Sequence, residues 1–508
     1  PGAARTARSS AGAGGVGKSS PHSVTALADG APFQSLRATP PTRAERLRLG
    51  KTLRETVPVA SLGDWSPGRR RDDPVELIIA NHIGRVPELI GVRVARMASS
   101  PYGFLRGSAV VMASDSAQLP STGIHPVICG DAHLGNFGFY RSPEGEQVID
   151  LNDFDEAHPG AWEWDLRRLT ASVHVAGREN GYSEDACSDA VRSCVVAYRD
   201  EMNLLAHEPL FRRSFNRMDV PSLNAHVRDA TLKTEIRRAL ATARKRTSDR
   251  ALPKMTTDTG EGRRIVEEPP LLTRLPRGEF EGVADSLDAY LATLQPHWRR
   301  VLGGYTLVDI AHKVVGVGSV GLRAYVALLE GSSPSDVLFL QLKQARRSVL
   351  AKYVHGGRAL HSHQGQRVVE YQQALQTVSD PLLGWTSVHT PVDADAVSWD
   401  GDYVSRDFYV RLFRNMKGTV PLDAITADAL GDYAGIVGHL LAKGHARTSG
   451  ASMISGYLGK GGAAADALAT YAARYADQTE ADHAAFVAAV RAGRLPIDET
   501  VTGSAFRP

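Results

Sequence analysis

The chain has 508 residues, of which 43% are hydrophobic and 23% are charged, and its formal net charge is +3 at pH 7. A single hydrophobic core stops growing near about 250–300 residues, so a chain of this length is expected to contain more than one lobe. The balanced charge argues against an obligate nucleic-acid or membrane partner, and no apolar run approaches the ~18–20 residues of a membrane-spanning helix.

The first 43 residues are rich in Ala, Gly, Ser, Arg and Pro, and they are predicted to be a disordered tail. Within them, residues 12–19 (GAGGVGKS) match the phosphate-loop pattern G-x-x-x-x-G-K-S. That motif needs a buried strand before it and a helix after it, whereas the preceding residues lack strand character and Pro21 interrupts a helix. We therefore interpret the match as coincidental.

Residues 44–54 and 73–97 are predicted to be helices, and residues 104–113 (FLRGSAVVMA) a helix or strand beneath the central loop described next. Arg106 in this last segment could reach a phosphate group. A structural ion pair is the preferred interpretation of its role.

The most informative stretch begins with an apolar run at residues 127–129, which predicts a short buried strand. A polar loop follows, D-A-H-L-G-N, from Asp131 to Asn136. A second apolar run, residues 147–151, leads into the turn N-D-F-D at residues 152–155. Two strands that deliver carboxylates and carboxamides to one end can bring a divalent metal and a proton acceptor together, and oxygen is the ligand that Mg²⁺ prefers.

The spacing Asp-x-x-x-x-Asn, followed by an acidic-Phe-acidic turn, is the arrangement that kinases use for the base and the metal ligands. It indicates Asp131 as the base and Asn136 with Asp153 as metal ligands. Asp155 is an alternative to Asp153, because the spacing does not choose between them. Two ordinary turns are the competing interpretation, since Asp, Asn and Gly are common in turns.

The segment CGDAHLGNFG resembles the H-G-D-x-H-x-G-N loop of aminoglycoside phosphotransferases and related small-molecule kinases, and IDLNDFDEA followed by WEWDLRRL resembles their I-D-F-D-x-A and D-L-A segments. Asp131, His133 and Asn136 match position by position, and the resemblance implies that Asp131 and His133 belong to the catalytic loop. Cys129 stands where those enzymes usually carry His. From about residue 44 to residue 494 the chain also resembles a bacterial family catalogued as domain of unknown function 2252.

Residues 165–177 and 183–205 are predicted to be core helices. Cys187 and Cys194 lie on one face of the second and are expected to be core thiols. Three cysteines in this chain do not form a disulfide framework, which favours a reducing compartment and predicts a cytoplasmic protein. The basic region 212–250 is interpreted as helical with a solvated face, because aromatic residues for base stacking are sparse there. Residues 252–276 are predicted to be a linker or mobile loop.

A glycine-rich pattern follows, formed by Gly316, Gly318, Ser319 and Gly321. In a dinucleotide-binding fold such glycines open a helix, whereas here a strand-like run, residues 322–329, comes next. Glycines at these positions would let backbone amides approach phosphate oxygens.

A third strand, residues 337–342, is predicted to end at Lys343. Strand, glycine loop, strand, turn and strand is the order of a kinase nucleotide lobe. Glu370, on a predicted helix over residues 367–377, is available to pair with Lys343. Residues 403–414 are predicted to be a further paired strand. A plain β-meander with a surface lysine is the alternative.

In kinases the glycine loop precedes the catalytic loop, whereas here it follows. The combined prediction is therefore an α+β, two-lobed, protein-kinase-like fold in circularly permuted order, with a mostly helical large lobe. The expected segments are a tail (1–43), N-terminal helices (44–126), a catalytic and metal-binding segment (127–210), a helical insertion and linker (211–300), a nucleotide-binding β lobe (301–420) and C-terminal helices (421–508).

The predicted activity is ATP- and Mg²⁺-dependent phosphoryl transfer to a hydroxyl or amine of a small-molecule acceptor. A nucleotidyltransferase on the same scaffold and a nucleotide-binding pseudokinase are the alternatives. The candidate residues are Asp131 and His133 for catalysis, Asn136, Asp153 and Asp155 for metal, and Gly316, Gly318, Ser319, Gly321, Lys343 and Glu370 for the nucleotide.

Overall fold

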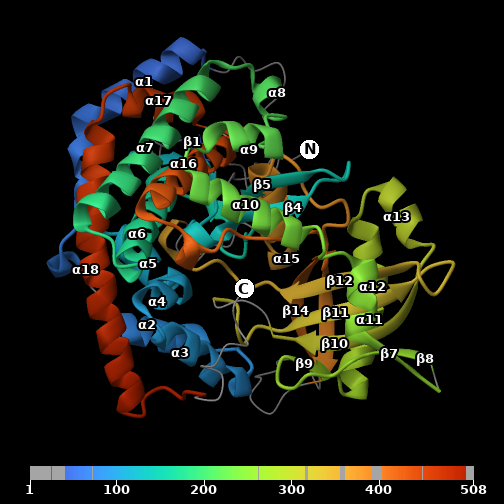
Figure 1. Cartoon of the computed structure of the whole chain (residues 1–508). Coiled ribbons are helices and arrows are strands. Elements are labelled where there is room, and N and C mark those ends of the chain that lie inside the picture. Colours follow the sequence, from blue (N-terminus) through green and yellow to red (C-terminus); the bar gives the residue numbers. More distant parts are fainter. Residues whose placement is uncertain are drawn as a thin grey trace, which may run out of the picture.

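The structure is a computed structural model that describes residues 24–25, 41–70, 72–260, 262–314, 318–354, 361–391, 403–448 and 450–498. A helical part lies beside a six-stranded antiparallel sheet, and this arrangement confirms the α+β prediction (Figure 1). The phosphate-loop-like residues 12–19 and Gly316 lie outside the described residues. Of the first 40 residues only β1 (Val24–Thr25) is described, and it pairs with β2 (Ile124–His125).

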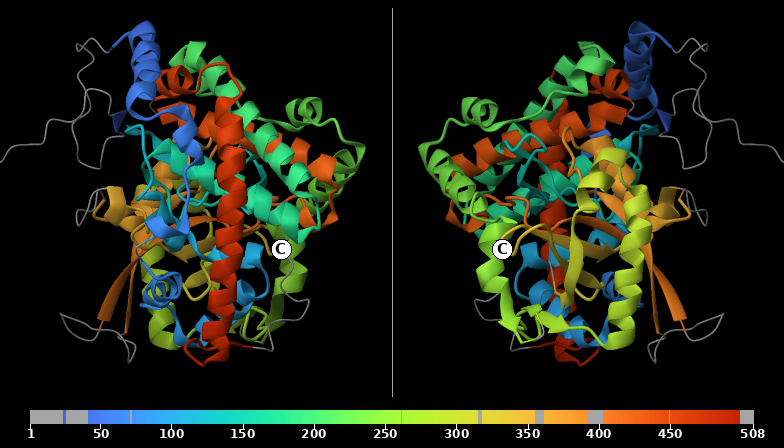
Figure 2. Two further views of the ribbon diagram at one scale, coloured as in Figure 1. Left: turned by 90° about the vertical axis from the view of Figure 1, so that its left-hand side faces the viewer. Right: turned by 90° about the vertical axis from the view of Figure 1, so that its right-hand side faces the viewer.

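The helical part consists of long helices that share one apolar core. They are α1 (Arg43–Thr56), α6 (Trp162–Glu179), α7 (Glu184–His207), α16 (Ala427–Thr448), α17 (Ala451–Leu458) and α18 (Ala463–Arg491). The helix α18 runs along one side of the molecule (Figure 2). Cys187 and Cys194 are buried free thiols on α7, as predicted. Among the described residues no helix combines the length and apolar character needed to cross a membrane.

Shorter helices from the N-terminal third pack next to the loop that carries Asp131. They are α2 (Pro74–His82), α3 (Ile90–Ala98), α4 (Pro101–Gly107) and α5 (Ala109–Ser116). The prediction of one helix over residues 73–97 is wrong, because the chain turns at Gly84, whose φ of 78° ends α2. Local periodicity could not reveal this break, since apolar residues continue on both sides of it.

The sheet has the strand order β13-β14-β12-β11-β10-β9. Its strands are β9 (Leu272–Arg274), β10 (Thr306–Lys313), β11 (Ala324–Glu330), β12 (Val337–Gln344), β13 (Gly384–Pro391) and β14 (Tyr403–Leu412). The predicted succession of strands around the glycine pattern is confirmed. The predicted linker over 252–276 is wrong, because it contains the hairpin β7 (Thr256–Thr259) and β8 (Gly262–Ile265) and then edge strand β9. Buried Ile265 and Leu272 hold these strands in place.

Both faces of the sheet are covered by helices, which explains the uninterrupted apolar run on β11. Tyr325 and Ala327 face α12 (Arg277–Thr293), whereas Val326 and Leu328 face α11 (Ser248–Met255). The same alternation on β12 directs Leu342 toward α12 and therefore Lys343 toward the opposite face. The sheet thus presents Lys343 to the interior of the protein.

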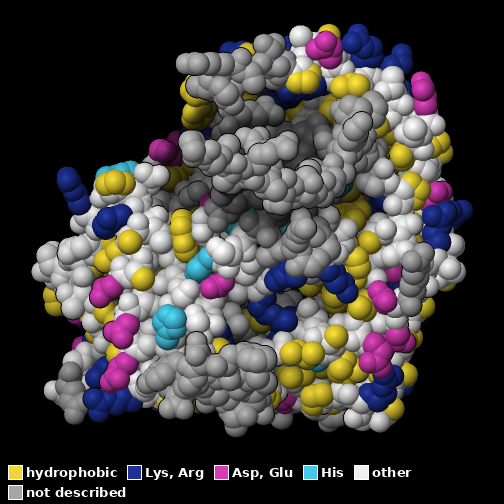
Figure 3. Space-filling model, turned by 180° about the vertical axis from the view of Figure 1, so that it is seen from behind, with side chains coloured by type: hydrophobic (Ala, Val, Ile, Leu, Met, Phe, Trp, Pro, Cys, Tyr) yellow, Lys and Arg dark blue, Asp and Glu magenta, His cyan; other side chains and the backbone are white. Residues whose placement is uncertain are grey.

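The helix α15 (Gln364–Leu375) packs against β13, β14 and α16 and so connects the sheet with the helical part. The remaining helices are α8 (Leu210–Arg213), α9 (Val220–His226), α10 (Ala230–Ala243), α13 (Pro296–Leu302) and α14 (Ala351–Val354). The basic region 212–250 is helical, as predicted. On the rear face of the molecule, Lys and Arg side chains gather near the middle (Figure 3).

The contact between α7 and α16 provides a test of the packing. A Cβ atom at Gly438 would overlap with the backbone carbonyl of Cys194, whereas a Cβ at Gly435 on the same helix has 3.9 Å of space to Ser193 O. Gly438→Ala is expected to lower the free energy of unfolding by about 1–3 kcal/mol. Gly435→Ala should raise it by up to about 1 kcal/mol, because alanine is the better helix former. Denaturant titration of both variants measures the difference, and equal effects would contradict the close approach.

Candidate functional site

The loop that carries Asp131 is fixed where strand β3 (Val127–Ile128) ends. Gly130 has φ +79°, and a Cβ atom there would overlap with the carbonyl oxygen of Glu156, so glycine is required. The carboxylate of Asp165, on α6, accepts hydrogen bonds from Cys129 N at 2.6 Å and Gly130 N at 2.8 Å. The loop therefore leaves the strand in one conformation.

Asp165 is held in turn by a buried polar network. His445 Nε2, on α16, lies 3.2 Å from Asp165 Oδ2, and His445 Nδ1 lies 2.8 Å from the Tyr198 hydroxyl. All three side chains are no more than 1% exposed. His445 is thus a structural histidine. Asp165 belongs to the segment that resembles the D-L-A motif, but the sequence did not predict what its carboxylate contacts.

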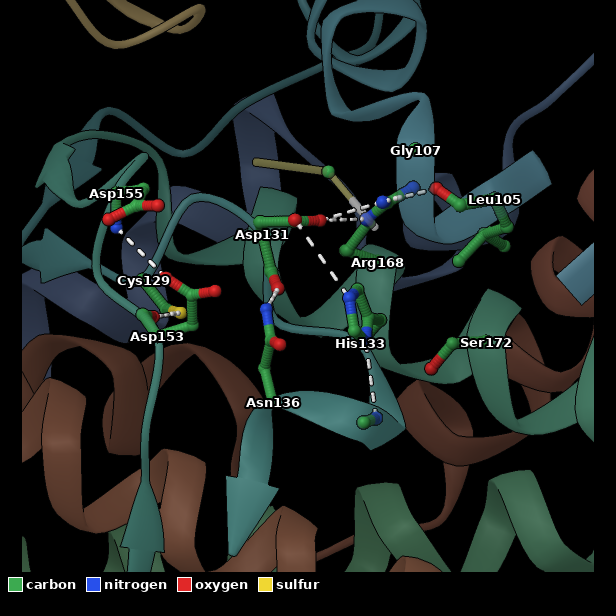
Figure 4. A network of polar contacts seen from close by, with 12 residues as sticks. Leu105, Gly107, Cys129, Asp131, His133, Asn136, Asp153, Asp155, Arg168 and Ser172 are labelled. Atoms are coloured by element: carbon green, nitrogen blue, oxygen red, sulfur yellow. Dashed lines mark hydrogen bonds and ion pairs between the residues drawn. The ribbon is translucent and has the colours of Figure 1, made fainter. Parts of the chain in front are cut away.

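Asp131 forms an ion pair with Arg168, which lies on α6 one turn after Asp165 (Figure 4). Arg168 Nε donates to Asp131 Oδ1 at 2.8 Å, and Arg168 Nη2 also donates to Leu105 O at 2.6 Å. Burial raises the pKa of Asp131 above its usual range, although Arg168 opposes the shift. The sequence analysis missed Arg168, whose signal was a pair of arginines directly after WEWDL in a predicted core helix.

His133 lies beside Asp131 but does not hydrogen-bond to it, because His133 Nε2 and Asp131 Oδ2 are 3.9 Å apart. Its Nδ1 accepts a hydrogen bond from Gly135 N at 3.1 Å. Burial and the charges of Arg106 and Arg168 hold the pKa of His133 well below its usual value. The imidazole is therefore neutral, with its proton on the Nε2 that faces Asp131.

The hairpin of β4 (Phe137–Arg141) and β5 (Gln147–Leu151) carries Asn136 to the N-D-F-D turn. Phe137 pairs with Leu151, and Asn152 N donates to Asn136 O at 3.0 Å. Asn136 Nδ2 donates to Asp131 O at 2.7 Å. This bond leaves Asn136 Oδ1 as an available oxygen ligand.

The two aspartates of the turn have different partners. Asp155 Oδ2 accepts from Lys343 Nζ at 3.0 Å and Asp155 Oδ1 accepts from Tyr409 Oη at 2.7 Å. Although burial acts in the opposite direction, Lys343 and Tyr409 hold the pKa of Asp155 below its usual value. Asp153 accepts from Asp155 N at 3.3 Å, and no described Lys, Arg or His lies within 4 Å of its carboxylate.

The predicted ion pair between Lys343 and Glu370 is wrong. Glu370 instead accepts hydrogen bonds from His361 Nε2 and Gln366 Nε2, both at 2.8 Å. The helix α15 reaches the site through Arg367, which donates to the backbone oxygen of Asp155 at 2.8 Å. The spacing of residues in the sequence predicted helix α15 correctly, but it did not predict which side chain of that helix contacts the site.

Of the glycine pattern, Gly318, Ser319 and Gly321 are described. Gly318 and Ser319 line the same pocket as Asp131. Gly321 has φ +87°, and its carbonyl accepts from Val86 N at 2.8 Å. The described part of the loop, from Gly318 to Gly321, therefore packs on the N-terminal helices and lies at the pocket of Asp131.

The pocket between these elements has a volume of about 110 Å³. Both acidic side chains and arginines line it, and the lining side chains include Asp131, His133, Asn136, Asp153, Asp155, Glu156, Arg85, Arg93 and Arg106. Lys343 reaches the site through Asp155, whereas neither Lys343 nor Glu370 lines the pocket.

No group of three or more His, Cys, Asp or Glu side chains in the described part of the chain is arranged to hold a metal ion. A Mg²⁺ ion would therefore depend on Asp153 and Asn136, with phosphate and water oxygens as its other ligands. This donor set fits Mg²⁺, which is commonly held by one or two carboxylates together with substrate phosphates.

The comparisons with known proteins give one match. The family model described as an uncharacterized protein conserved in bacteria (DUF2252) matches residues 85–489. Neither the curated proteins nor the solved structures contain a match. Because the matched region covers most of the 508 residues, the chain belongs to the DUF2252 family of bacterial proteins.

Proposed function

We propose that this protein is an ATP- and Mg²⁺-dependent phosphotransferase of kinase-like architecture that acts on a hydroxyl or amine of a small molecule. The observation that carries the proposal is the contact between Lys343 and Asp155. These residues are 188 positions apart in sequence, and their charged atoms are 3.0 Å apart. This contact brings the glycine-loop sheet to the loops of Asp131 and Asp153.

The order of elements around Lys343 supports the same proposal. Lys343 lies on β12, the third strand of the meander that contains the glycine pattern, and helix α15 comes after that strand and the short helix α14. In protein kinases the nucleotide lysine is likewise on the third strand, and the helix αC follows. The catalytic segment precedes this sheet in the chain, so the proposed fold is a circular permutation.

The acidic side of the pocket supplies the proposed chemistry. Asp131 would accept the proton of the acceptor, and burial, which raises its pKa, makes it a better base at neutral pH. Arg168 fixes the carboxylate through Oδ1, which leaves Oδ2 to face the acceptor. Bound Mg²⁺ would neutralise phosphate charge.

Asp153 is the better candidate for the metal, because Asp155 already holds Lys343 and Tyr409. Asn136 Oδ1 would provide the second protein oxygen. Lys343 would add a point charge for the phosphates from the sheet side of the site.

The direct test of the function is incubation of the protein with ATP, Mg²⁺ and a fractionated cell extract, followed by mass spectrometry. A product heavier than its precursor by one phosphoryl group supports the proposal. Transfer of a nucleotidyl group, or no ATP- and Mg²⁺-dependent product, would contradict it.

Asp131→Asn tests the proposed base. The substitution keeps the shape of the side chain and removes the proton acceptor, so turnover should fall by about 10²–10⁴-fold while nucleotide affinity changes little. Asp189→Asn, at an exposed position on α7, is the matched control and should keep full activity. Loss of nucleotide binding with an unchanged chemical step would make Asp131 a structural residue instead.

Lys343→Met tests the contribution of the sheet. It should weaken Mg²⁺-nucleotide binding and lower activity, because a buried cation near the phosphates is lost. The matched control is Lys352→Met, since Lys352 is an exposed lysine that also lies over a tyrosine ring. Calorimetric titration with the Mg²⁺–ATP complex measures the effect.

Lys343→Met also leaves Asp155 without its counter-charge, which could lower stability. Lys343→Arg keeps a positive charge there, and circular dichroism verifies the fold of each variant. Unchanged nucleotide affinity in folded Lys343→Met protein would contradict a nucleotide role for the sheet.

A further inference from the structure

Three arginines that line the pocket form no ion pair with a described residue. Arg85, Arg93 and Arg106 come from the segment that contains α2, α3 and α4, and no described carboxylate lies within 4 Å of their guanidinium groups. Arg93 is 1% exposed and Arg85 is 9% exposed. Burial of a cation without a counter-charge is unfavourable, so this arrangement calls for an explanation.

The hydrogen bonds of the two most buried arginines go to neutral groups. Arg93 donates to Gly107 O at 2.6 Å and lies 3.1 Å from His82 Nε2. Arg85 donates to Asn81 O at 3.1 Å and to Val320 O at 2.5 Å. These bonds fix the side chains but supply no counter-charge, and only Arg85 is affected electrostatically by carboxylates, those of Glu156 and Asp155, from beyond ion-pair distance.

Two other arginines of the chain do have carboxylate partners. Arg70 contacts the carboxylates of Asp115 and Asp482, both at 2.5 Å, and Arg168 contacts Asp131. Buried Arg167 and Arg367 also donate only to neutral groups, but neither lines this pocket. At the pocket the positive charge acts on a neighbouring side chain: burial, followed by Arg93 and Arg85, lowers the pKa of His82 to about 3.

Of the three arginines, Arg106 has the most N–H groups without a hydrogen-bond acceptor among the described residues. Its buried Nε has no hydrogen-bond partner, and its side chain makes no ion pair among the described residues, so the structural ion pair predicted for it is wrong. Gly318 packs against the backbone of Arg106, with a Cβ there 3.3 Å from Arg106 O. The planar fork of a guanidinium matches two oxygens of one phosphate group.

We propose that Arg106, supported by Arg85 and Arg93, binds a phosphate group in the pocket that also contains Asp153. The pocket lining offers both charges that a metal–phosphate pair needs: carboxylates for the cation and arginines for the oxyanion. The phosphate belongs either to the end of a nucleotide or to a phosphorylated acceptor. Its place in a transfer reaction rests on the proposed function, whereas the oxyanion site rests on the charges of the pocket alone.

Isothermal titration of the full chain with inorganic phosphate, Mg²⁺–ADP and Mg²⁺–ATP tests this site. Arg106→Gln should weaken phosphate binding by roughly 10–100-fold, which is the range for loss of charge-assisted hydrogen bonds. Arg96→Gln is the matched control, because Arg96 lies close enough to affect Arg106 electrostatically but does not line the pocket. It should change affinity by less than about threefold.

The three ligands distinguish the two sources of the phosphate. If Arg106→Gln weakens Mg²⁺–ATP more than Mg²⁺–ADP, the site holds the terminal phosphate of the nucleotide. If it weakens inorganic phosphate and leaves both nucleotides unchanged, the site holds a phosphate of the acceptor. If none of the three affinities falls, or if wild-type protein binds none of the ligands, the proposal is overturned.

Arg106→Lys provides a second variant in case Arg106→Gln does not fold. It keeps the charge but loses the bidentate fork, so an intermediate loss of affinity is expected. Asp131→Asn separates this inference from the proposed function, because it should lower turnover by about 10²–10⁴-fold and leave phosphate binding intact. Phosphate binding that depends on Arg106 in a protein without transferase activity would keep the site and reject the enzyme.

Discussion

A lysine that is 5% exposed needs a counter-charge, and in this protein that requirement connects the sheet with the helical part. Lys343 obtains the charge from Asp155, across the boundary between the six-stranded sheet and the N-D-F-D turn. Tyr409, opposite Lys343 in the register of β12 and β14, binds the other oxygen of the same carboxylate. Two adjacent strands thus hold one end of the candidate site, and the geometry of the pocket follows from that contact.

The other end of the site depends on one turn of helix α6. Asp165 fixes the backbone where β3 ends, and Arg168, three residues later, fixes the carboxylate of Asp131. Residues at this spacing lie on the same face of a helix. A single rigid element therefore sets both the path of the loop and the orientation of its aspartate.

The sequence allowed prediction of the features that have local patterns. The strands around the glycine pattern, the loop from Asp131 to Asn136 and the buried cysteines all have short-range signals, and they lie where predicted. No short-range signal shows which charged side chains will pair. Lys343 contacts Asp155 instead of Glu370, and Arg106 lacks the predicted ion pair. These outcomes depend on which side chains meet after long segments pack, which spacing along the chain does not encode.

The order of segments also affects how the protein is made. The strands of the sheet lie in one continuous stretch, residues 272–412, whereas the helical part combines α1 and α6 with α17 and α18 from the end of the chain. During synthesis the N-terminal helices emerge long before their packing partners. His445, which contacts Asp165, is also translated late. The loop of Asp131 therefore acquires its full support only after His445, 280 positions beyond Asp165, has left the ribosome.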